Sequence, residues 1–160
     1  MSADPCPMCA RFPALAAGSD PDLIAQLEHS YVVLADSVTW PGWCVLILKE
    51  HGEHLDMLEA ARRAGIMGEV GRVGAALRAA GLGIRINYEC LGNVVNHIHW
   101  HVIPRRVDEP EPRATVWTRP APERDRGGTA QERETLVLRI RMQLEKLEDH
   151  SGPTTWSFGT

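Results

Sequence analysis

Three histidines alternate with large apolar residues in the stretch 96–105, which reads Asn-His-Ile-His-Trp-His-Val-Ile-Pro-Arg. A strict period of two places His97, His99 and His101 on one face of a β-strand and the apolar residues on the other face, toward a core. Imidazoles on a rigid strand can attack phosphorus, donate hydrogen bonds or bind a metal ion. The stretch therefore predicts a functional strand.

The spacing of the three histidines predicts a division of labour among them. Neighbouring imidazoles on a strand lie roughly 6.6 Å apart, and the outer two lie about 13 Å apart. Zinc bonds to imidazole nitrogen are only about 2.0–2.1 Å long. Two adjacent histidines could share one ion, whereas all three could not.

A second pair of candidate ligands lies at the N-terminus, in Cys6-Pro7-Met8-Cys9. A C-x-x-C pair is half of a zinc site, a thioredoxin-like redox pair or two unrelated cysteines. The redox interpretation requires the pair at the start of a helix in a βαβ unit, and no strand precedes it here. A zinc site is the better interpretation, provided that two more ligands lie downstream.

The motif His97-Ile98-His99-Trp100-His101-Val102 resembles the histidine-triad pattern, in which three histidines alternate with apolar residues. The Pro-Arg that follows it, and a Pro41-Gly42 turn leading into an apolar run that ends in Lys49-Glu50-His51, are also familiar from that family. The chain is identified as a member of the histidine-triad (HIT) family, and it resembles bacterial dinucleoside polyphosphate hydrolase-like members.

The resemblance implies an α+β fold. In that fold an antiparallel sheet of about five strands packs against a long helix, and a further helix is added at the C-terminus. Because members are commonly homodimers, a homodimer is also expected.

The resemblance also implies a zinc site formed by Cys6, Cys9, His51 and His97. Two thiolates and two imidazoles close a four-coordinate site with no open position, so the zinc would be structural. It would fasten the N-terminus to the sheet and fix the first histidine of the triad. His54 is a rival for His51, and the sequence alone does not decide between them.

Catalysis is assigned by the resemblance to His99, as the nucleophile that attacks the α-phosphorus of a nucleotide. His101 would donate a hydrogen bond to phosphate oxygens or to the leaving group, and it lies closest to Pro104-Arg105-Arg106, where it can meet phosphate charge. Asn87 and Asn93 stand near the family's nucleotide-binding positions. Asn87 is one residue closer to the triad than is usual, so each is equally well a turn amide or a solvated strand residue.

Two functions follow from these residues. The first is a nucleotide hydrolase or nucleotidyltransferase that acts on a dinucleoside polyphosphate or a nucleoside phosphoramidate through a nucleotidyl-histidine intermediate. The second is a nucleotide-binding or zinc-binding regulatory module without significant turnover. An intact triad favours the enzyme.

The elements that must position these residues can be read from the hydrophobic pattern. Strands are expected at 30–35, 44–48, 84–90 and 94–103, with the last two forming a hairpin through Leu91-Gly92-Asn93. A helix is expected at 55–80, with Glu69 facing water. Its glycines at 65, 68, 71 and 74 indicate either close backbone approach or a break near Gly65.

The C-terminal third is expected to contain an irregular loop after residue 106 and then one helix. Thr129 and Glu132 have the spacing of a capping box, in which a threonine caps the helix and a glutamate follows three residues later. The helix should run to about residue 148. A short tail, 151–160, would be disordered or packed only through Trp156.

Bulk properties are those of an ordinary globular domain. The 160 residues predict one domain over 1–150 followed by the tail. A formal charge of −4 gives no support for general nucleic-acid binding, and no apolar run reaches the ~20 residues that cross a membrane. The N-terminus has neither the basic region nor the apolar core of a secretory signal. A cytoplasmic location with reduced cysteines is expected.

Overall fold

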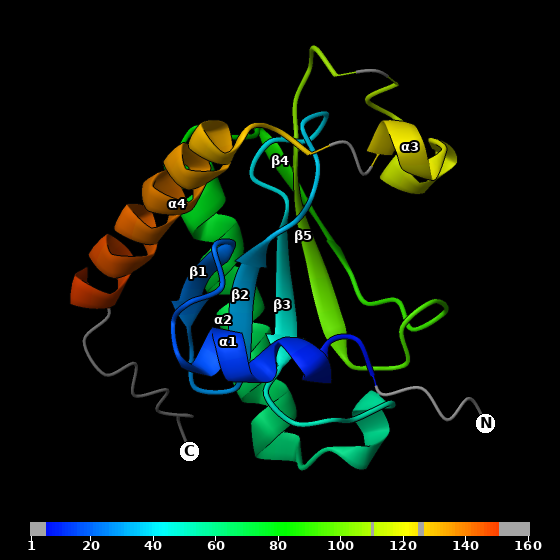
Figure 1. The fold of residues 1–160 in the computed structure, drawn as a ribbon, viewed down its shortest axis with the longest axis vertical. Helices are drawn as coiled ribbons and strands as arrows, with labels where there is room; N and C mark the ends of the chain where they lie inside the picture. Colours follow the sequence, from blue (N-terminus) through cyan, green and yellow to red (C-terminus); the bar gives the residue numbers. More distant parts are fainter. Residues whose placement is uncertain (1–5, 110, 125–126, 151–160) are drawn as a thin grey trace, which may run out of the picture.

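The fold is α+β and is built on one antiparallel five-stranded sheet, as the sequence predicts (Figure 1). The computed structural model describes residues 6–109, 111–124 and 127–150, so the tail and Trp156 lie outside the described residues. The strands are β1 (Leu23–Gln26), β2 (Ser30–Leu34), β3 (Cys44–Leu48), β4 (Arg85–Glu89) and β5 (His99–Arg105), in the sheet order β1-β2-β3-β5-β4. The described helices are α1 (Phe12–Ala16), α2 (Ala60–Ala79), α3 (Ala121–Arg124) and α4 (Ala130–His150), with 3-10 turns at Cys9–Arg11, Leu55–Met57 and Val116–Thr118.

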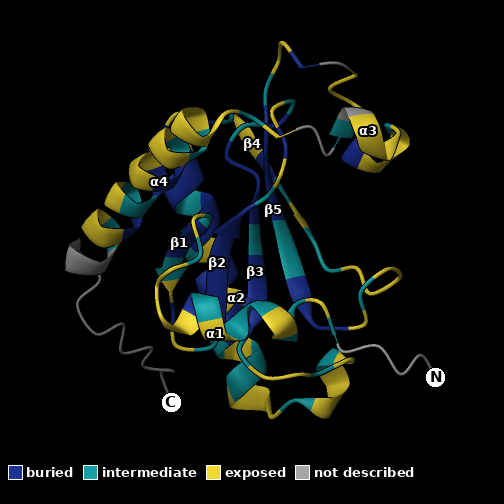
Figure 2. Cartoon of the chain, in the orientation of Figure 1, coloured by how far each residue is buried: buried dark blue, intermediate teal, exposed yellow. Residues whose placement is uncertain are grey.

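The two faces of the sheet are covered by different parts of the chain. Helices α2 and α4 pack on one face and enclose the main core, which includes Val73, Leu77 and Ile140 (Figure 2). On the opposite face α1 covers a smaller cluster around Leu15 and Tyr31. The three histidines of the motif belong to this second face, which leaves them reachable beside α1.

Strand β5 shows the predicted alternation, but it begins later than predicted. Val102 and Ile98 are buried in the main core, and Trp100 packs against it. The chain turns just before the strand, where the His97 amide donates to the Val95 carbonyl at 2.9 Å. The ladder with β3 therefore starts at His99, and His97 precedes the strand.

The predicted pairing of β4 with β5 is present, although its connection is longer than a tight turn. Asn87 lies opposite Ile103 and Glu89 lies opposite His101. Residues 90–98 form the connection, so Gly92 belongs to a wide loop. Because opposed residues share a face of a sheet, Asn87 and Glu89 lie on the histidine side.

Helix α2 begins at Ala60, five residues later than predicted, after extended backbone at Leu58 and Glu59. It runs without a break through Gly65, so close approach explains that glycine. A Cβ atom at Gly65 would meet the His29 ring, and one at Gly74 would meet the Tyr88 hydroxyl.

The prediction that Glu69 faces water was wrong. Glu69 is buried, and its carboxylate accepts hydrogen bonds from the His29 amide at 2.7 Å and the Ser30 hydroxyl at 2.6 Å. The turn between β1 and β2 has amide and hydroxyl groups that need an acceptor, and the helix supplies it.

Strand β1 was not predicted, because its four residues show neither clear alternation nor a continuous apolar run. It pairs with β2 and forms the edge of the sheet. Arg141 of α4 donates to the carbonyl oxygens of Leu23 and Ile24, at 2.7 and 2.9 Å. The C-terminal helix is thus tied to the sheet by backbone contacts as well as by its apolar face.

The capping box predicted for the C-terminal helix is present. The Glu132 amide donates to the Thr129 hydroxyl at 3.2 Å, and the Thr129 amide donates to the Glu132 carboxylate at 2.8 Å. Ile140 and Leu144 are buried on the core face of α4. No helix among the described residues is long and apolar enough to cross a membrane.

Replacing Thr129 with alanine should lower the free energy of unfolding by about 1 kcal/mol, because one amide of the first turn of α4 loses its acceptor. Hydrogen exchange at residues 130–133 should accelerate. Thr135→Ala is the control, since the Thr135 hydroxyl donates only to a carbonyl inside the same helix. Unchanged exchange at 130–133 in Thr129→Ala would show that the cap is not needed.

Candidate functional site

Four sulfur and nitrogen donors meet where the N-terminus crosses the sheet. The candidate ligand atoms of Cys6, Cys9, His51 and His97 all lie within 4.8 Å of one another. The Sγ atoms of Cys6 and Cys9 are 3.5 and 3.6 Å from Nδ1 of His97, and Cys9 Sγ is 3.5 Å from Nδ1 of His51. A tetrahedral ion with bonds of about 2.3 Å to sulfur and about 2.1 Å to nitrogen would hold such atoms about 3.6 Å apart.

The outer nitrogens of both histidines face acceptors, which leaves their inner nitrogens able to bind a metal. His97 is buried, and its Nε2–H donates to the Leu48 carbonyl at 2.9 Å. Nε2 of His51 faces the Glu53 carboxylate at 3.7 Å. In each ring the lone pair is therefore on Nδ1, which points at the thiols. His54 directly precedes the 3-10 turn at Leu55–Met57 without a side-chain capping bond, and it is not part of this cluster.

The proximity of the two cysteine thiols favours a bound cation between them. Burial, followed by the neighbouring Cys6 thiol, raises the pKa of Cys9, because a second thiolate beside the first is repelled. A bound cation would reverse this effect. Burial also lowers the pKa of His97 and keeps the ring neutral, as metal binding requires.

The segment that carries the N-terminal cysteines is held in place by aromatic packing and by a salt bridge. Phe12 of α1 lies 5.5 Å from Tyr31 and 5.8 Å from His97, ring centre to ring centre. Arg11 donates two parallel bonds to Asp20, at 3.0 and 2.9 Å. The segment that carries Cys6 and Cys9 is consequently fixed against the histidine face of the sheet.

His99 has one nitrogen occupied and one available. Its Nδ1–H donates to the carbonyl oxygen of His97 at 2.6 Å, which leaves the lone pair on Nε2. The residue is only 5% exposed, and burial lowers its pKa. The ring is therefore neutral near pH 7 and can act as a nucleophile.

His101 carries its proton on the other ring nitrogen from His99. The indole Nε1–H of Trp43 donates to Nδ1 of His101 at 3.2 Å, so the proton of the neutral ring is on Nε2. Burial, together with His99 and the positive charge of Arg124, lowers the pKa of His101 to about 4. His101 is a neutral hydrogen-bond donor, and its ring centre lies 4.9 Å from that of His99.

A cavity of about 510 Å³ opens above these two histidines. Asn93, which was predicted to contact the substrate, lines it with His99 and His101. Asn87 lies on the same face of the sheet, beside Ile103, but it is not among the lining residues. The remaining wall is formed by Met8, Ala35, Asp36, Ser37, Trp43, Val45, Leu91, Val94, Val95, Trp117 and Arg124.

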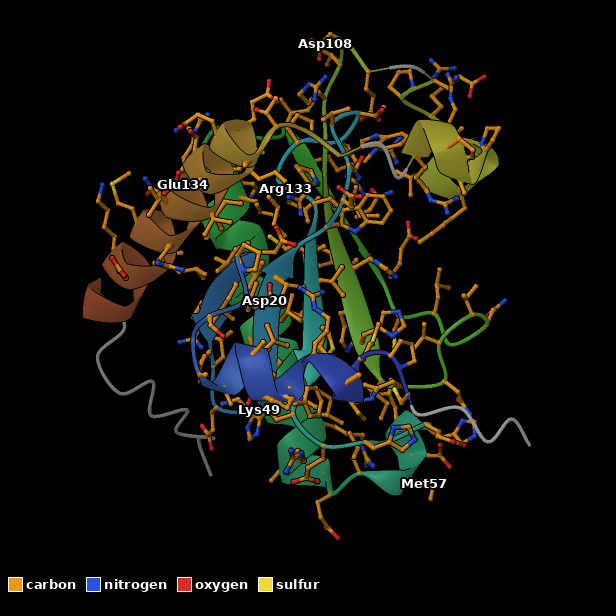
Figure 3. All side chains as sticks on the ribbon, viewed as in Figure 1. Asp20, Lys49, Met57, Asp108, Arg133 and Glu134 are labelled. Carbon is orange, nitrogen blue, oxygen red and sulfur yellow. The ribbon has the colours of Figure 1, made fainter. Side chains whose placement is uncertain are left out.

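A second cavity of about 400 Å³ adjoins the first and shares His101, Asp36 and Met8 with it. Its other wall includes Arg133 of α4, whose guanidinium donates to Asp22 at 2.6 Å and to Asp36 at 2.8 Å. Figure 3 shows Arg133 on the side of α4 that faces the sheet and Glu134 on the outer side. His101 therefore lines both cavities.

Three residues of the site were missed in the sequence: Trp43, Trp117 and Arg124. Trp43 directly follows the Pro41-Gly42 turn, and the other two lie in the segment after residue 106 that was expected to be an irregular loop. Trp117 contacts both Trp43 and His101 with its ring edge-on, and Arg124 lies 4.8 Å above the Trp117 ring. Two tryptophans near a Pro-Gly turn and a Val-Trp pair in a loop were the only signals available.

A buried ion pair positions the loop that carries Trp117. Arg105 and Glu109 are only 6% and 4% exposed, and the guanidinium Nε donates to the carboxylate at 2.6 Å. Arg105 also donates to the Ala114 carbonyl at 2.7 Å. Val116 is then buried beside Trp40 and Trp43, which brings Trp117 to His101. The Arg105 side chain is thus engaged in holding this loop.

The first comparison with known proteins identifies the family. A family model described as the HIT domain matches residues 17–108, which is more than half of the chain. The chain belongs to the HIT family. The match ends before Trp117 and Arg124 and begins after Cys6 and Cys9, so part of the site lies outside it. The family includes nucleotide-binding proteins, hydrolases and transferases.

Solved structures agree with this assignment. A histidine triad protein from Sinorhizobium meliloti 1021 is 27% identical, with a TM-score of 0.69, covering 76% of this chain and 87% of that chain. A zinc-bound histidine triad family protein from Mycobacterium smegmatis is 24% identical, with a TM-score of 0.68, covering 91% and 97% of the two chains. A hypothetical histidine triad nucleotide-binding protein from Sulfolobus tokodaii is 18% identical, with a TM-score of 0.71, covering 93% and 100%. A comparison with curated protein sequences found no match.

Glu109→Gln should lower the free energy of unfolding by about 3 kcal/mol, because it leaves the buried Arg105 charge without its partner. Urea unfolding measures the loss. Asp108→Asn is the matched control, since Asp108 forms only an exposed pair with Arg106 and should change stability little. Equal effects of the two substitutions would contradict the role given to the buried pair.

Proposed function

We propose that this HIT protein is a nucleotide hydrolase or nucleotidyltransferase that acts at an α-phosphate through a nucleotidyl-histidine. The observation that supports it best is the orientation of His99. Its Nδ1–H is bonded to a backbone carbonyl, so its Nε2 lone pair is the one left for attack. A neutral, buried, immobilised imidazole beside a cavity is suited to covalent catalysis.

The proposed reaction has two displacements at phosphorus. Nε2 of His99 attacks the α-phosphorus, a P–N bond forms, and the bond from phosphorus to the leaving group breaks with its electron pair going to that group. Water or another acceptor then attacks the same phosphorus, breaks the P–N bond and restores the neutral imidazole. His101 donates a hydrogen bond through Nε2–H to phosphate oxygens or to the leaving group, without giving up its proton.

The two adjoining cavities that His101 lines suit a substrate with a substantial group on each side of the reacting phosphorus. Dinucleoside polyphosphates and nucleoside phosphoramidates both have that form. Asn93 lines the larger cavity and can donate or accept a hydrogen bond there. Asn87 would contribute only to a substrate that reaches past His101 along the sheet.

We also propose that Cys6, Cys9, His51 and His97 hold a structural zinc ion. The support is the donor set itself: two thiols and two imidazoles that present Nδ1 lone pairs at distances fitting a tetrahedral ion. Zinc would supply positive charge that stabilises the two thiolates, and it would fasten the N-terminus to the sheet. The related protein from Mycobacterium smegmatis is zinc-bound.

A homodimer is the proposed assembly, and its most suitable surface is the free edge of the sheet. Strand β4 is the last strand, and the chain beside it exposes Ile84 and Tyr88. A second copy could add its own β4 to this edge. The cytoplasmic location and the single-domain division stay predictions.

Freshly purified protein should contain one zinc ion per chain, measured by elemental analysis. Cys6→Ser should lose the ion and lower the melting temperature, because metal-binding energy contributes to folding. His51→Ala should also lose it, and His54→Ala should keep it. Zinc retained in His51→Ala and lost in His54→Ala would reassign the ligand, and zinc absent throughout would refute the site.

His99→Ala should eliminate turnover while preserving the fold, zinc content and nucleotide binding. A screen of nucleotide substrates with product identification measures the activity, and acid-quenched mass spectrometry should locate the nucleotidyl group on His99 in the unmodified protein. His101→Ala should reduce turnover less completely, because it assists rather than bonds. A nucleotide mapped to His101 would overturn the assignment, and binding without any turnover would indicate the regulatory module.

A further inference from the structure

His101 is enclosed by two indole rings that approach it edge-on. Its ring centre is 5.4 Å from that of Trp43 and 5.1 Å from that of Trp117. Tryptophan has an N–H donor and no acceptor. The bond from Trp43 to Nδ1 of His101 therefore holds only while that nitrogen is unprotonated.

The second indole, that of Trp117, binds the carboxylate of the residue paired with His101 in the sheet. Glu89 of β4 is paired directly opposite His101 of β5, so their side chains share a face. A carboxylate in that position would favour a protonated imidazole. The Nε1–H of Trp117 instead donates to Glu89 Oε2 and occupies it.

The other ionisable groups around His101 either disfavour its protonation or are engaged by donors of their own. His99 and the Arg124 guanidinium lower the pKa of His101, in addition to burial. Asp36 lines the same cavity, but its carboxylate is paired with Arg133 at 2.8 Å. The acidic groups around His101 in the described structure are Glu89, Asp36 and Asp22, and each has a donor of its own: Trp117 for Glu89, and Arg133 for the two aspartates.

We propose that the indole N–H groups of Trp43 and Trp117 together hold His101 as a neutral donor with its proton on Nε2. Trp43 does so by occupying Nδ1, and Trp117 does so by occupying Glu89. Both tryptophans are positioning residues that act through His101. These two hydrogen bonds set the protonation of His101 whether or not the protein is an enzyme. Their contribution to catalysis rests on the proposed function.

The test is the titration of His101, followed by NMR of the imidazole in the zinc-loaded protein. The unmodified protein should titrate near pH 4, and Trp43→Phe should raise the midpoint by about one unit, because Nδ1 becomes free to accept a proton. Trp117→Phe should raise it similarly. The double variant Trp117→Phe/Glu89→Gln should return it toward the original value, because the carboxylate is gone.

Trp40→Phe is the matched control. Trp40 belongs to the same aromatic cluster, is 1% exposed and has an indole nitrogen without a hydrogen-bond partner in the described structure. Trp40→Phe removes the same ring atoms as Trp43→Phe but breaks no hydrogen bond. The midpoint of the His101 titration should therefore not move. An unmoved midpoint in Trp43→Phe, or equal shifts in Trp43→Phe and Trp40→Phe, would overturn the proposal. A midpoint that stays raised in the double variant would overturn the part played by Trp117.

Activity provides a second, separable readout. In Trp43→Phe, kcat should fall by about tenfold or more with KM little changed, because a donor to the transition state is no longer held in place. Trp40→Phe should keep kcat. If the unmodified protein turns over no nucleotide, the proposed function fails while the NMR titration still decides whether the two indoles hold His101.

Discussion

The hydrogen bond from Nδ1 of His99 to the carbonyl of His97 is the constraint on which the rest of the site depends. It leaves the lone pair of His99 on Nε2. It also joins the two halves of the site, because His97, whose backbone carbonyl accepts this bond, presents its own Nδ1 to the cysteines. The neighbouring rings are fixed by different partners: His97 by the Leu48 carbonyl and His101 by the Trp43 indole. Three chemically identical side chains, two in β5 and one just before it, thereby have different nitrogens available.

This arrangement requires contributions from both ends of the chain around the part that matches the family. The N-terminal segment brings two thiols to His97 and is held by Phe12 and Arg11. The loop after β5 is fixed by the buried pair of Arg105 and Glu109 and brings an indole to His101. Helix α4 covers the core, and its Arg133 lines the second cavity. The part that matches the family contains the histidine strand, and the segments outside it complete the cysteine–histidine cluster and the walls of the cavities.

The features that could be predicted from the sequence are those with a local signal. A period of two predicted the histidine face and its apolar back, an apolar run predicted β3 with its observed bounds, and a threonine three residues before a glutamate predicted the cap of α4. The candidate ligands His51 and His97 were suggested by family resemblance, and the structure brings them to Cys6 and Cys9.

The features that were missed depend on contacts between distant segments. Glu69 has the charge of a solvent-facing residue, but a turn about forty positions away needs its oxygens. The sequence places Trp117 in an irregular loop. The buried pair of Arg105 and Glu109 holds that loop against the sheet. No local pattern reports such pairings, because each side chain is ordinary in its own segment.

The most direct test of this account is the position of the proton on each imidazole of the triad in the resting, zinc-loaded protein at pH 7. Long-range proton–nitrogen NMR correlations distinguish the two nitrogens of a histidine ring. We expect protons on Nε2 of His97, on Nδ1 of His99 and on Nε2 of His101, each set by the partner described above. A proton on Nε2 of His99 would leave no lone pair directed at the substrate and would contradict the account.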